Sequence, residues 1–257
     1  MITGIVVALP EELTTLTSIK IDKGRCLFIA SKLLVAYSGA GAVNAEAAAE
    51  LLVAKGASRL ISWGCAAALS ASSRSGDLIL ADKLIDAGNV EMTVNADWHS
   101  DTKNRLATIA VVHSGCLAES KSIVSSSKDK KQLHSITSAI AVDMESIAIA
   151  KVARQHELPF LSIRAIADPV NMDLPSAISY ALNGNGDIVL GKVFSFLFLH
   201  PAELPGLIKL GLYFNAAMKT LKSVAKQLDK VADFSSDKGM LTIHHKAGIE
   251  DQAQSAR

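Results

Sequence analysis

Short apolar runs of strand length alternate with longer helical segments, and this alternation constrains the fold more than any other feature of the sequence. The first run, residues 2–9, is rich in Ile and Val and predicts a buried strand. Further strands are expected at residues 27–30, 33–37, 59–63, 78–81, 107–112, 139–142 and 159–166, with a small-residue loop at 64–68. Helices are expected at residues 44–55, 145–156 and, with a break near Pro205, 201–228. The pattern predicts an α/β fold in which helices cover both faces of a sheet.

Length and composition set the expected domain organisation. The chain has 257 residues, of which 49% are hydrophobic and 20% are charged, so a sizeable core is expected. We predict a single domain over residues 1–232, whose apolar helical C-terminal part covers residues 188–232. A polar, flexible tail is expected at residues 233–257.

Charge and residue usage argue against several classes of protein. A formal net charge of +1 provides no field for gathering nucleic acid, so no nucleic-acid partner is expected.

Three cysteines without CxxC spacing favour reduced thiols, and the N-terminus lacks the basic start of a signal peptide. The longest apolar stretch, 188–199, contains Lys192 and is too short to span a bilayer. We therefore expect a cytoplasmic protein, and the scattered histidines predict no metal site.

Gly39-Ala40-Gly41 lies between an expected strand and an expected helix, as a dinucleotide-binding fingerprint does. Asn44, however, stands where that motif has its third glycine, and no acidic residue ends a suitable second strand. We therefore interpret the segment as an ordinary turn and expect no cofactor.

Carboxylates at strand ends are candidates for acid–base chemistry. The segment Val142-Asp143-Met144-Glu145-Ser146 carries Glu145 into the first turn of an expected helix, whose dipole stabilises an anion. Asp168 ends an apolar strand, and Pro169 restricts it to extended backbone at the edge where open α/β sheets bind ligands. Each acid also has a purely structural interpretation, as a helix cap or a turn residue.

Two further residues depend on their surroundings for a role. Arg164 alternates with apolar residues on an expected buried strand, so it needs an anionic partner, and Glu145 is a candidate. Glu12 follows the first strand beside Glu11, and on their own these two acids would face solvent.

Three segments spread over most of residues 1–170 carry a resemblance to a known family. They are Gly4-Ile-Val-Val-Ala-Leu-Pro-Glu-Glu12, Ile61-Ser-Trp-Gly-Cys-Ala-Ala-Ala-Leu69 with Gly76-Asp77-Leu78, and Ala141-Val-Asp-Met-Glu-Ser146 with Arg164-Ala-Ile-Ala-Asp168. Together they resemble the superfamily of purine nucleoside phosphorylases and methylthioadenosine/adenosylhomocysteine nucleosidases. The resemblance implies a three-layer fold with a mixed central sheet, a nucleoside substrate and a homo-oligomer.

Within this superfamily, the chain resembles the hopanoid-associated phosphorylases, also described as adenosylhopane nucleosidases. Asp143-Met-Glu-Ser146, Asp168-Pro169 and the segment His200-Pro-Ala-Glu-Leu-Pro205 carry this likeness. It implies release of adenine from adenosylhopane, leaving ribosylhopane, in hopanoid synthesis. The alternatives are a methylthioadenosine/adenosylhomocysteine nucleosidase, a phosphate-dependent phosphorylase, and a non-catalytic binding relative.

The resemblance also implies roles by position. Glu12 resembles the acid that activates water, Glu145 resembles the acid that holds the ribose hydroxyls, and Asp168 resembles the acid that serves purine N7. The substrate-binding residues implied in this way are Cys65, Ala66, Val124, Met144 and Arg164. The chain departs from nucleosidases at Cys65, Ala67, Ala68, Ala167 and Asn171, which affects substrate choice rather than the three carboxylates.

The chemistry explains why such residues are needed. Cleaving an N-glycosidic bond builds positive charge on ribose and negative charge on the base, so a nearby anion and a proton donor both help. An attacking phosphate would need cations and backbone N–H groups, whereas the segment around Glu12 has Pro10, two acids and no arginine before Arg25. We therefore favour water as the nucleophile, with phosphate as the alternative co-substrate.

The C-terminal segment has two interpretations. Its apolar residues, from Phe194 to Phe214, fit a helix packed on the core. They also fit an apolar mouth or a surface resting on the inner membrane, which a lipid-linked nucleoside would require.

Overall fold

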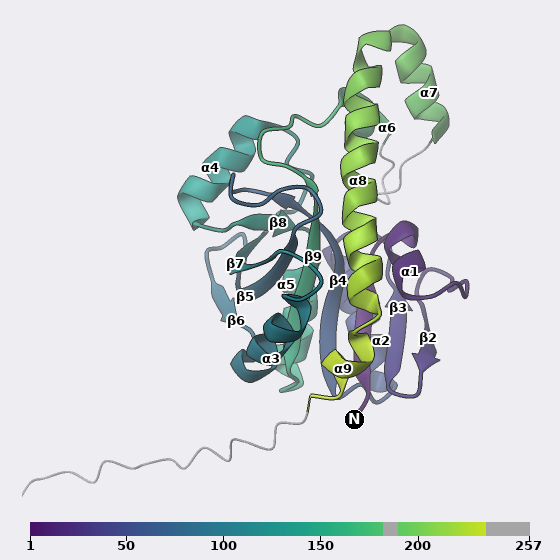
Figure 1. The fold of residues 1–257 in the computed structure, drawn as a ribbon. Helices are drawn as coiled ribbons and strands as arrows, with labels where there is room; N and C mark the ends of the chain where they lie inside the picture. Colours follow the sequence, from purple (N-terminus) through teal and green to yellow (C-terminus); the bar gives the residue numbers. More distant parts are fainter. Residues whose placement is uncertain (182–189, 235–257) are drawn as a thin grey trace, which may run out of the picture.

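The computed structural model of the protein describes residues 1–181 and 190–234, and Figure 1 shows their path. The strands are β1 (Thr3–Val7), β2 (Arg25–Ala30), β3 (Leu33–Tyr37), β4 (Arg59–Ala68), β5 (Leu78–Ile85), β6 (Glu91–Thr93), β7 (Val112–Glu119), β8 (Ala141–Asp143) and β9 (Phe160–Asp168). The helices are α1 (Pro10–Leu16), α2 (Ala42–Ala54), α3 (Ala96–Leu106), α4 (Ser127–Thr137), α5 (Ser146–Gln155), α6 (Ser176–Ala181), α7 (Leu190–Leu199), α8 (Leu204–Ala225) and α9 (Leu228–Ala232), with a 3-10 turn at Pro201–Glu203.

All these strands belong to one mixed sheet. β1 lies between β3 and β4 and is parallel to both, and β2 extends this half as an antiparallel strand. In the other half, β9 is parallel to β4 and antiparallel to β5, while β7 is parallel to β5 and β8. Because β8 also pairs with the end of β4, the strands β4, β9, β5, β7 and β8 close into a ring.

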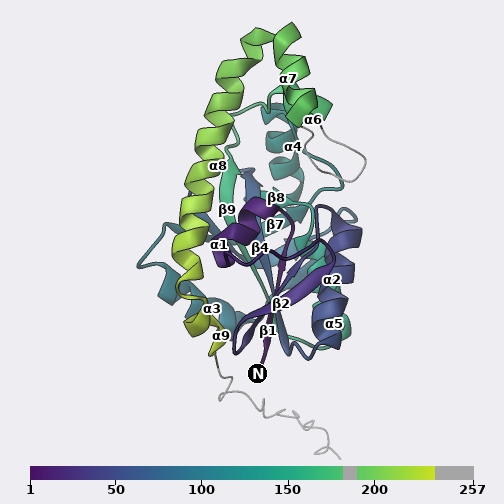
Figure 2. The ribbon, with the colours of Figure 1, turned by 90° about the vertical axis from the view of Figure 1, so that its right-hand side faces the viewer.

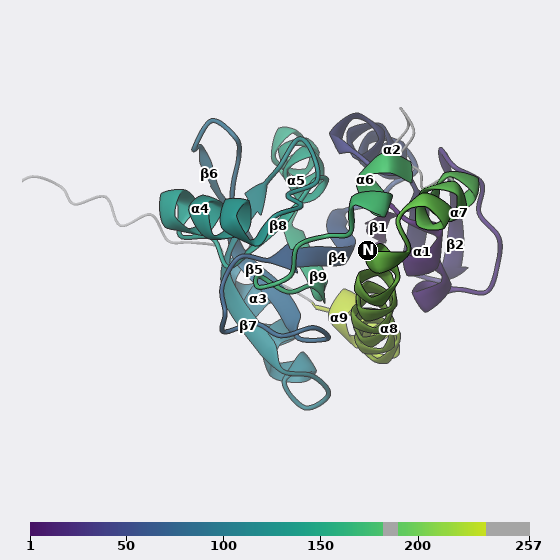
Figure 3. The same ribbon diagram turned by 90° about the horizontal axis from the view of Figure 1, so that it is seen from above.

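Helices cover both faces of this sheet, which confirms the expected three-layer α/β fold. α2 and α5 pack against each other on one face, whereas α8 packs against β9 and α1 on the other. Figure 2 separates α2 and α5 from α8 and α9 clearly, and the view from above in Figure 3 shows the same two groups. Fully buried aliphatic side chains such as Ile5, Leu60 and Ile163 fill the space between the layers.

The structure shows that one expected strand is wrong. Residues 107–111 belong to no strand, because α3 extends to Leu106 and β7 begins only at Val112. Asn95 caps α3 by accepting a hydrogen bond from the backbone N–H of Trp98 at 2.9 Å, so the polar segment forms a helix. The short apolar run that follows is the end of that helix and its turn.

The small-residue segment at residues 64–68 is a strand and not the expected loop. It forms the second half of β4 and pairs with β9 on one side and, through Ala67 and Ala68, with β8 on the other. The segment lacks the branched residues typical of strands, and only its pairing partners reveal its conformation.

The helical segment expected at residues 201–228 is divided near Pro205, where the 3-10 turn at Pro201–Glu203 ends and α8 begins its run from Leu204 to Ala225. Pro205 stands in its first turn, where the missing backbone N–H is tolerated. The C-terminal half buries Ala217, Leu221 and Val224 against the sheet. The N-terminal half projects beyond the sheet together with α6 and α7, as Figures 1 and 2 show.

The expected tail begins with two anchored residues. The carboxylate of Asp233 pairs with the ammonium of Lys32 at 2.6 Å, and the carbonyl of Phe234 accepts a hydrogen bond from Arg59 Nη1 at 2.7 Å. The remainder of that tail, residues 235–257, lies outside the described residues.

Gly4 on β1 leaves no room for a side chain, because an added Cβ would lie 3.0 Å from Ala57 Cβ and Leu60 Cδ2 and 3.1 Å from Leu52 Cβ. We expect Gly4→Ala to lower the free energy of unfolding by about 1–3 kcal/mol, since overpacking displaces the neighbouring side chains. Chemical denaturation measures this change. Gly211→Ala on α8 is the control: nothing lies within 4 Å of its added Cβ, and alanine favours helices. Unchanged stability of Gly4→Ala would contradict the tight packing of β1.

Candidate active site

The parallel pairing of β1, β4 and β9 brings their carboxyl ends to one edge of the sheet. In the register of β4 with β9, Gly64 lies opposite Arg164 and Ala67 lies opposite Asp168. β1 ends beside the middle of β4, so α1, which follows β1, begins over the same place. Segments distant in the sequence therefore meet where open α/β sheets bind ligands.

Glu12, which the sequence placed only as an acid after the first strand, lies in the first turn of α1 and is buried. Its Oε2 accepts a hydrogen bond from the backbone N–H of Leu9 at 3.0 Å, and its Oε1 accepts one from that of Cys65 at 2.7 Å. Burial raises the pKa of Glu12 to about 7, against the opposing effects of Arg164 and the two backbone donors. A carboxyl group with this pKa can accept a proton near neutral pH.

Arg164 is fully buried, and its partner is Asp143 rather than the expected Glu145. Its Nε lies 2.7 Å from Asp143 Oδ2, and its Nη2 donates to the hydroxyls of Ser62 and Ser146. Ser146 also donates to Asp143 Oδ2 at 2.5 Å. The sequence contained a signal for Asp143, since it ends the strand that leads to Glu145, but two acids so close together could not be ranked from spacing alone.

Gly64 permits this arrangement by its lack of a side chain. A Cβ at this position would lie 2.5 Å from both Arg164 Nη1 and Glu12 Oε1. The arginine and the glutamate therefore both occupy the space that a side chain at this position of β4 would take.

Glu145 stands just before α5, and its carboxylate reaches the glycine turn that resembled a dinucleotide fingerprint. The backbone N–H of Gly41 donates to Glu145 Oε1 at 2.9 Å. Burial raises the pKa of Glu145, while Arg164 lowers it and Asp143 raises it further. The turn thus holds a carboxylate of the protein itself.

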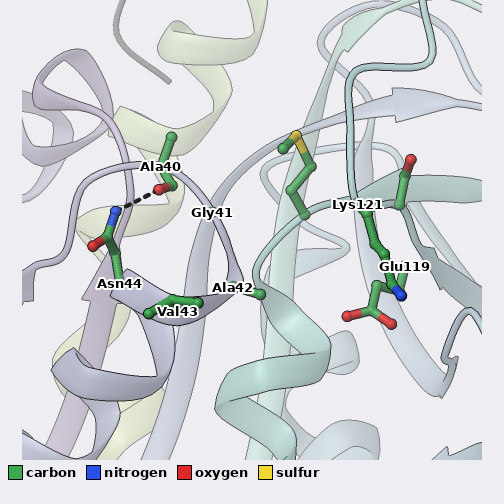
Figure 4. Close-up of a pocket in the computed structure, with 9 residues that line it drawn as sticks. Ala40, Gly41, Ala42, Val43, Asn44, Glu119 and Lys121 are labelled. Atoms are coloured by element: carbon green, nitrogen blue, oxygen red, sulfur yellow. Dashed lines mark hydrogen bonds between the residues drawn. The ribbon is translucent and has the colours of Figure 1, made fainter. Parts of the chain in front are cut away.

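A pocket of about 260 Å³ opens beside Glu145, between the glycine turn and the chain that follows β7 (Figure 4). Asn44 steadies the turn by donating its side-chain N–H to the carbonyl of Ala40 at 2.7 Å. Met144, one of the implied substrate-binding residues, lies in the pocket wall, whereas Glu119 and Lys121 were not anticipated. The full lining is formed by residues 40–44, 119–121 and 144.

Asp168 is buried at the end of β9 and has two unlike oxygens. Oδ1 accepts a hydrogen bond from Lys130 Nζ at 2.6 Å, whereas the buried Oδ2 has no hydrogen-bond partner among the described residues. Burial raises the pKa of Asp168 to about 6, although Lys130 opposes this shift. Sequence reasoning missed Lys130, because it lies in a polar run that is typical of a solvated helix face.

The remaining expected binding residues lie nearby. Burial and the neighbouring Glu12 raise the pKa of the Cys65 thiol, so this group stays protonated and is no nucleophile. Ala66 is buried in β4. Val124 packs against a small apolar cluster that includes Cys116 on β7 and Val142 on β8. In residues 1–181 and 190–234, no group of three His, Cys, Asp or Glu side chains could hold a metal ion.

Comparisons with known proteins agree with this architecture. The chain is similar to the solved 5'-methylthioadenosine/S-adenosylhomocysteine nucleosidase from Neisseria meningitidis, with 21% identity over 89% of this chain and 98% of that chain, and a TM-score of 0.66. The corresponding enzyme from Helicobacter pylori has 20% identity over 90% and 97%, with a TM-score of 0.65. Futalosine hydrolase from Helicobacter pylori has 19% identity over 90% and 97%, with a TM-score of 0.64. No curated protein matches the sequence.

At these identities, the solved structures support the fold alone. The family model described as the phosphorylase superfamily, in contrast, matches residues 3–180, which is more than half of the chain. This match includes the three strand ends that carry Glu12, Glu145 and Asp168. The chain therefore belongs to the phosphorylase superfamily.

Proposed function

We propose that this protein hydrolyses the N-glycosidic bond of a purine nucleoside and releases adenine. The observation that carries this proposal is the contrast between two buried carboxyl groups. Backbone N–H groups hold both oxygens of Glu12, whereas one oxygen of Asp168 has no partner among the described residues. Such a contrast suits one base and one acid. The solved neighbours named as nucleosidases and as a hydrolase support the same reaction class.

Each carboxyl group has one role in the proposed reaction. Glu12 accepts a proton from water while the water oxygen forms a bond to the anomeric carbon. Glu145 orients the ribose and stabilises the positive charge that develops on it. The bond from that carbon to the base breaks, and its electron pair leaves with the base. Asp168 supplies a proton to purine N7, and proton exchange with solvent then restores both groups.

Water suits this site better than phosphate does. Three acids, Glu12, Asp143 and Glu145, act on the buried guanidinium of Arg164, and Asp143 already pairs with it. A phosphate dianion would meet these carboxyl groups and find Arg164 occupied, whereas a ribosyl cation would be stabilised.

Adenine release should therefore proceed in phosphate-free buffer and yield the free sugar rather than its 1-phosphate. Chromatography of adenosine digests with and without phosphate measures both products. Glu12→Gln should lower kcat by about 100-fold or more, because it removes the proposed base, whereas the exposed neighbour Glu11→Gln serves as the matched control. Strict dependence on phosphate would overturn hydrolysis in favour of phosphorolysis.

Asp168→Asn should lower kcat for adenine release about 100-fold or more while preserving the fold, because it removes the titratable proton donor. The wild-type rate should fall with rising pH as Asp168 loses its proton, and with falling pH as Glu12 gains one. With pKa values of about 6 and about 7, the optimum of kcat/KM should lie between these two values. Asp22→Asn, at an exposed loop carboxylate that is not among the groups acting on Asp168, is the control. A loss below about tenfold for Asp168→Asn would argue against a general acid.

We further propose that the substrate carries a hopanoid lipid at its 5′ position, so that adenosylhopane yields ribosylhopane and adenine. The support is an apolar arm, defined as α6, α7 and residues 204–214, which projects from the sheet (Figure 1). Its most exposed apolar side chains include Phe198 (87%), Leu199 (72%) and Leu212 (65%). A methylthioadenosine or adenosylhomocysteine nucleosidase, the alternative, has a small substrate that needs no such surface.

A membrane surface is the partner that we propose for this arm, which places the protein at the cytoplasmic face of the inner membrane. Lys192 and Lys209 are exposed on the arm, while Glu203 in the adjoining 3-10 turn accepts a hydrogen bond from the backbone N–H of Ser176. This excess of positive charge suits anionic lipid headgroups. Among the described helices, none is long and apolar enough to cross a membrane. The homo-oligomer implied by the resemblance is part of the same proposal.

Leu212→Glu should weaken sedimentation with anionic liposomes and slow adenine release from adenosylhopane, while release from adenosine persists. The reason is that an exposed apolar side chain contributes to interfacial binding in proportion to its buried area, about 25 cal/mol per Å². Ile136→Glu on α4 is the matched control, since Ile136 is similarly exposed (63%) but lies outside the arm. Equal loss with both substrates, or no liposome binding by the wild type, would rule out the membrane role.

A further inference from the structure

Lys130 on α4 is a fully buried lysine that no step of the proposed reaction has used. Its Nζ donates to Asp168 Oδ1 at 2.6 Å, to the carbonyl of Met172 at 2.8 Å and to the carbonyl of Pro169 at 3.2 Å. These three acceptors match the three N–H donors of an ammonium group. A neutral amine has only two, so the geometry favours the charged form.

The acceptors of Lys130 also define the surroundings of Asp168. Two of them are carbonyls of the chain that leaves β9, so Lys130 ties α4 to the segment that begins at Pro169. The charged groups that act on Asp168 are Lys130 and, as a weaker and opposite influence, Asp173. β4, which lies beside the end of β9, contributes only Ala67 at this point.

This arrangement makes the two oxygens of Asp168 chemically different. A proton on Oδ1 would face a cationic donor at 2.6 Å and would be strongly disfavoured. The proton of the acid form must therefore reside on Oδ2, the buried oxygen without a hydrogen-bond partner among the described residues. The same cation stabilises the carboxylate that remains once this proton has left.

We propose that Lys130 is the positioning residue of the proton donor: it holds Oδ1 of Asp168 unprotonated, directs the proton to Oδ2, and stabilises the carboxylate formed when the base departs. This inference rests on the proposed nucleosidase reaction for its catalytic meaning. The effect on Asp168 itself can be measured without any substrate.

The first measurement is the pKa of Asp168, followed through the carboxyl ¹³C shift in NMR titrations. Lys130→Met and Lys130→Gln both remove the charge, whereas Gln keeps two donors for the carbonyls of Pro169 and Met172. Loss of a cation at this distance should raise the pKa of Asp168 by about one to three units in both variants. Lys131→Met is the matched control, because Lys131 neighbours Lys130 on α4 but is exposed. Circular dichroism and thermal unfolding verify that each variant folds.

The second measurement separates proton donation from general damage by means of the leaving group. Adenosine needs a proton on its base, whereas 4-nitrophenyl β-riboside releases a stable anion without one. Lys130→Gln should lower kcat for adenosine by about tenfold or more and leave the nitrophenyl riboside nearly unaffected. The optimum of kcat/KM for adenosine should also move to higher pH, because it lies midway between the pKa values of Asp168 and Glu12 and the first of these rises.

An unchanged pKa of Asp168 in a folded Lys130→Gln protein would overturn the inference. So would an equal loss of activity toward both ribosides, which would make Lys130 a structural tie alone. If instead the pKa rises but the wild type releases adenine from no nucleoside, the control of Asp168 by Lys130 stands and the proposed reaction fails. The two ideas are thus tested separately.

Discussion

The buried ion pair between Arg164 and Asp143 is the interaction on which the rest of the site depends. A guanidinium group removed from water is strongly destabilising unless an acid and hydrogen-bond acceptors compensate it, and Asp143, Ser62 and Ser146 do so here. With its charge balanced in this way, Arg164 can remain near Glu12, where it lowers the pKa of that carboxyl group and so opposes the effect of burial. Loss of Asp143 would leave an uncompensated cation in the core, which typically destabilises a protein by about 3–5 kcal/mol.

The sheet topology builds the proposed reaction centre around this pair. β9 presents Arg164 and Asp168 four residues apart, so that a single strand supplies both the cation near Glu12 and the carboxyl group beside Lys130. Each of the two acids, Glu12 and Asp168, is buried, but each has a different set of donors, and this difference rather than the residue type separates the proposed base from the proposed acid. Because β9 pairs with both β4 and β5 within the closed ring of strands, the positions of Arg164 and Asp168 relative to β4 are set by the strand register.

α8 combines the two interpretations that the sequence left open. Its C-terminal half is a core helix, with Ala217, Leu221 and Val224 buried, while its N-terminal half exposes Leu204, Ile208 and Leu212. Both halves have the same helical apolar periodicity, because a stripe of apolar residues specifies a face but not what covers that face. The helix is buried where it lies against the sheet and exposed where it extends past the end of the sheet.

The sequence by itself determined the order of most strands and helices, the family, and the choice of Glu12, Glu145 and Asp168 as candidate residues. These inferences rest on local periodicity and on motifs within single segments. Tertiary structure decided what the sequence could not: that residues 64–68 are a strand, that Asp143 rather than Glu145 pairs with Arg164, and that Lys130 reaches Asp168. The physical reason is that an ion pair depends on strand register and on the distance between side chains remote in the chain. Those distances exist only once β4, β8 and β9 have paired.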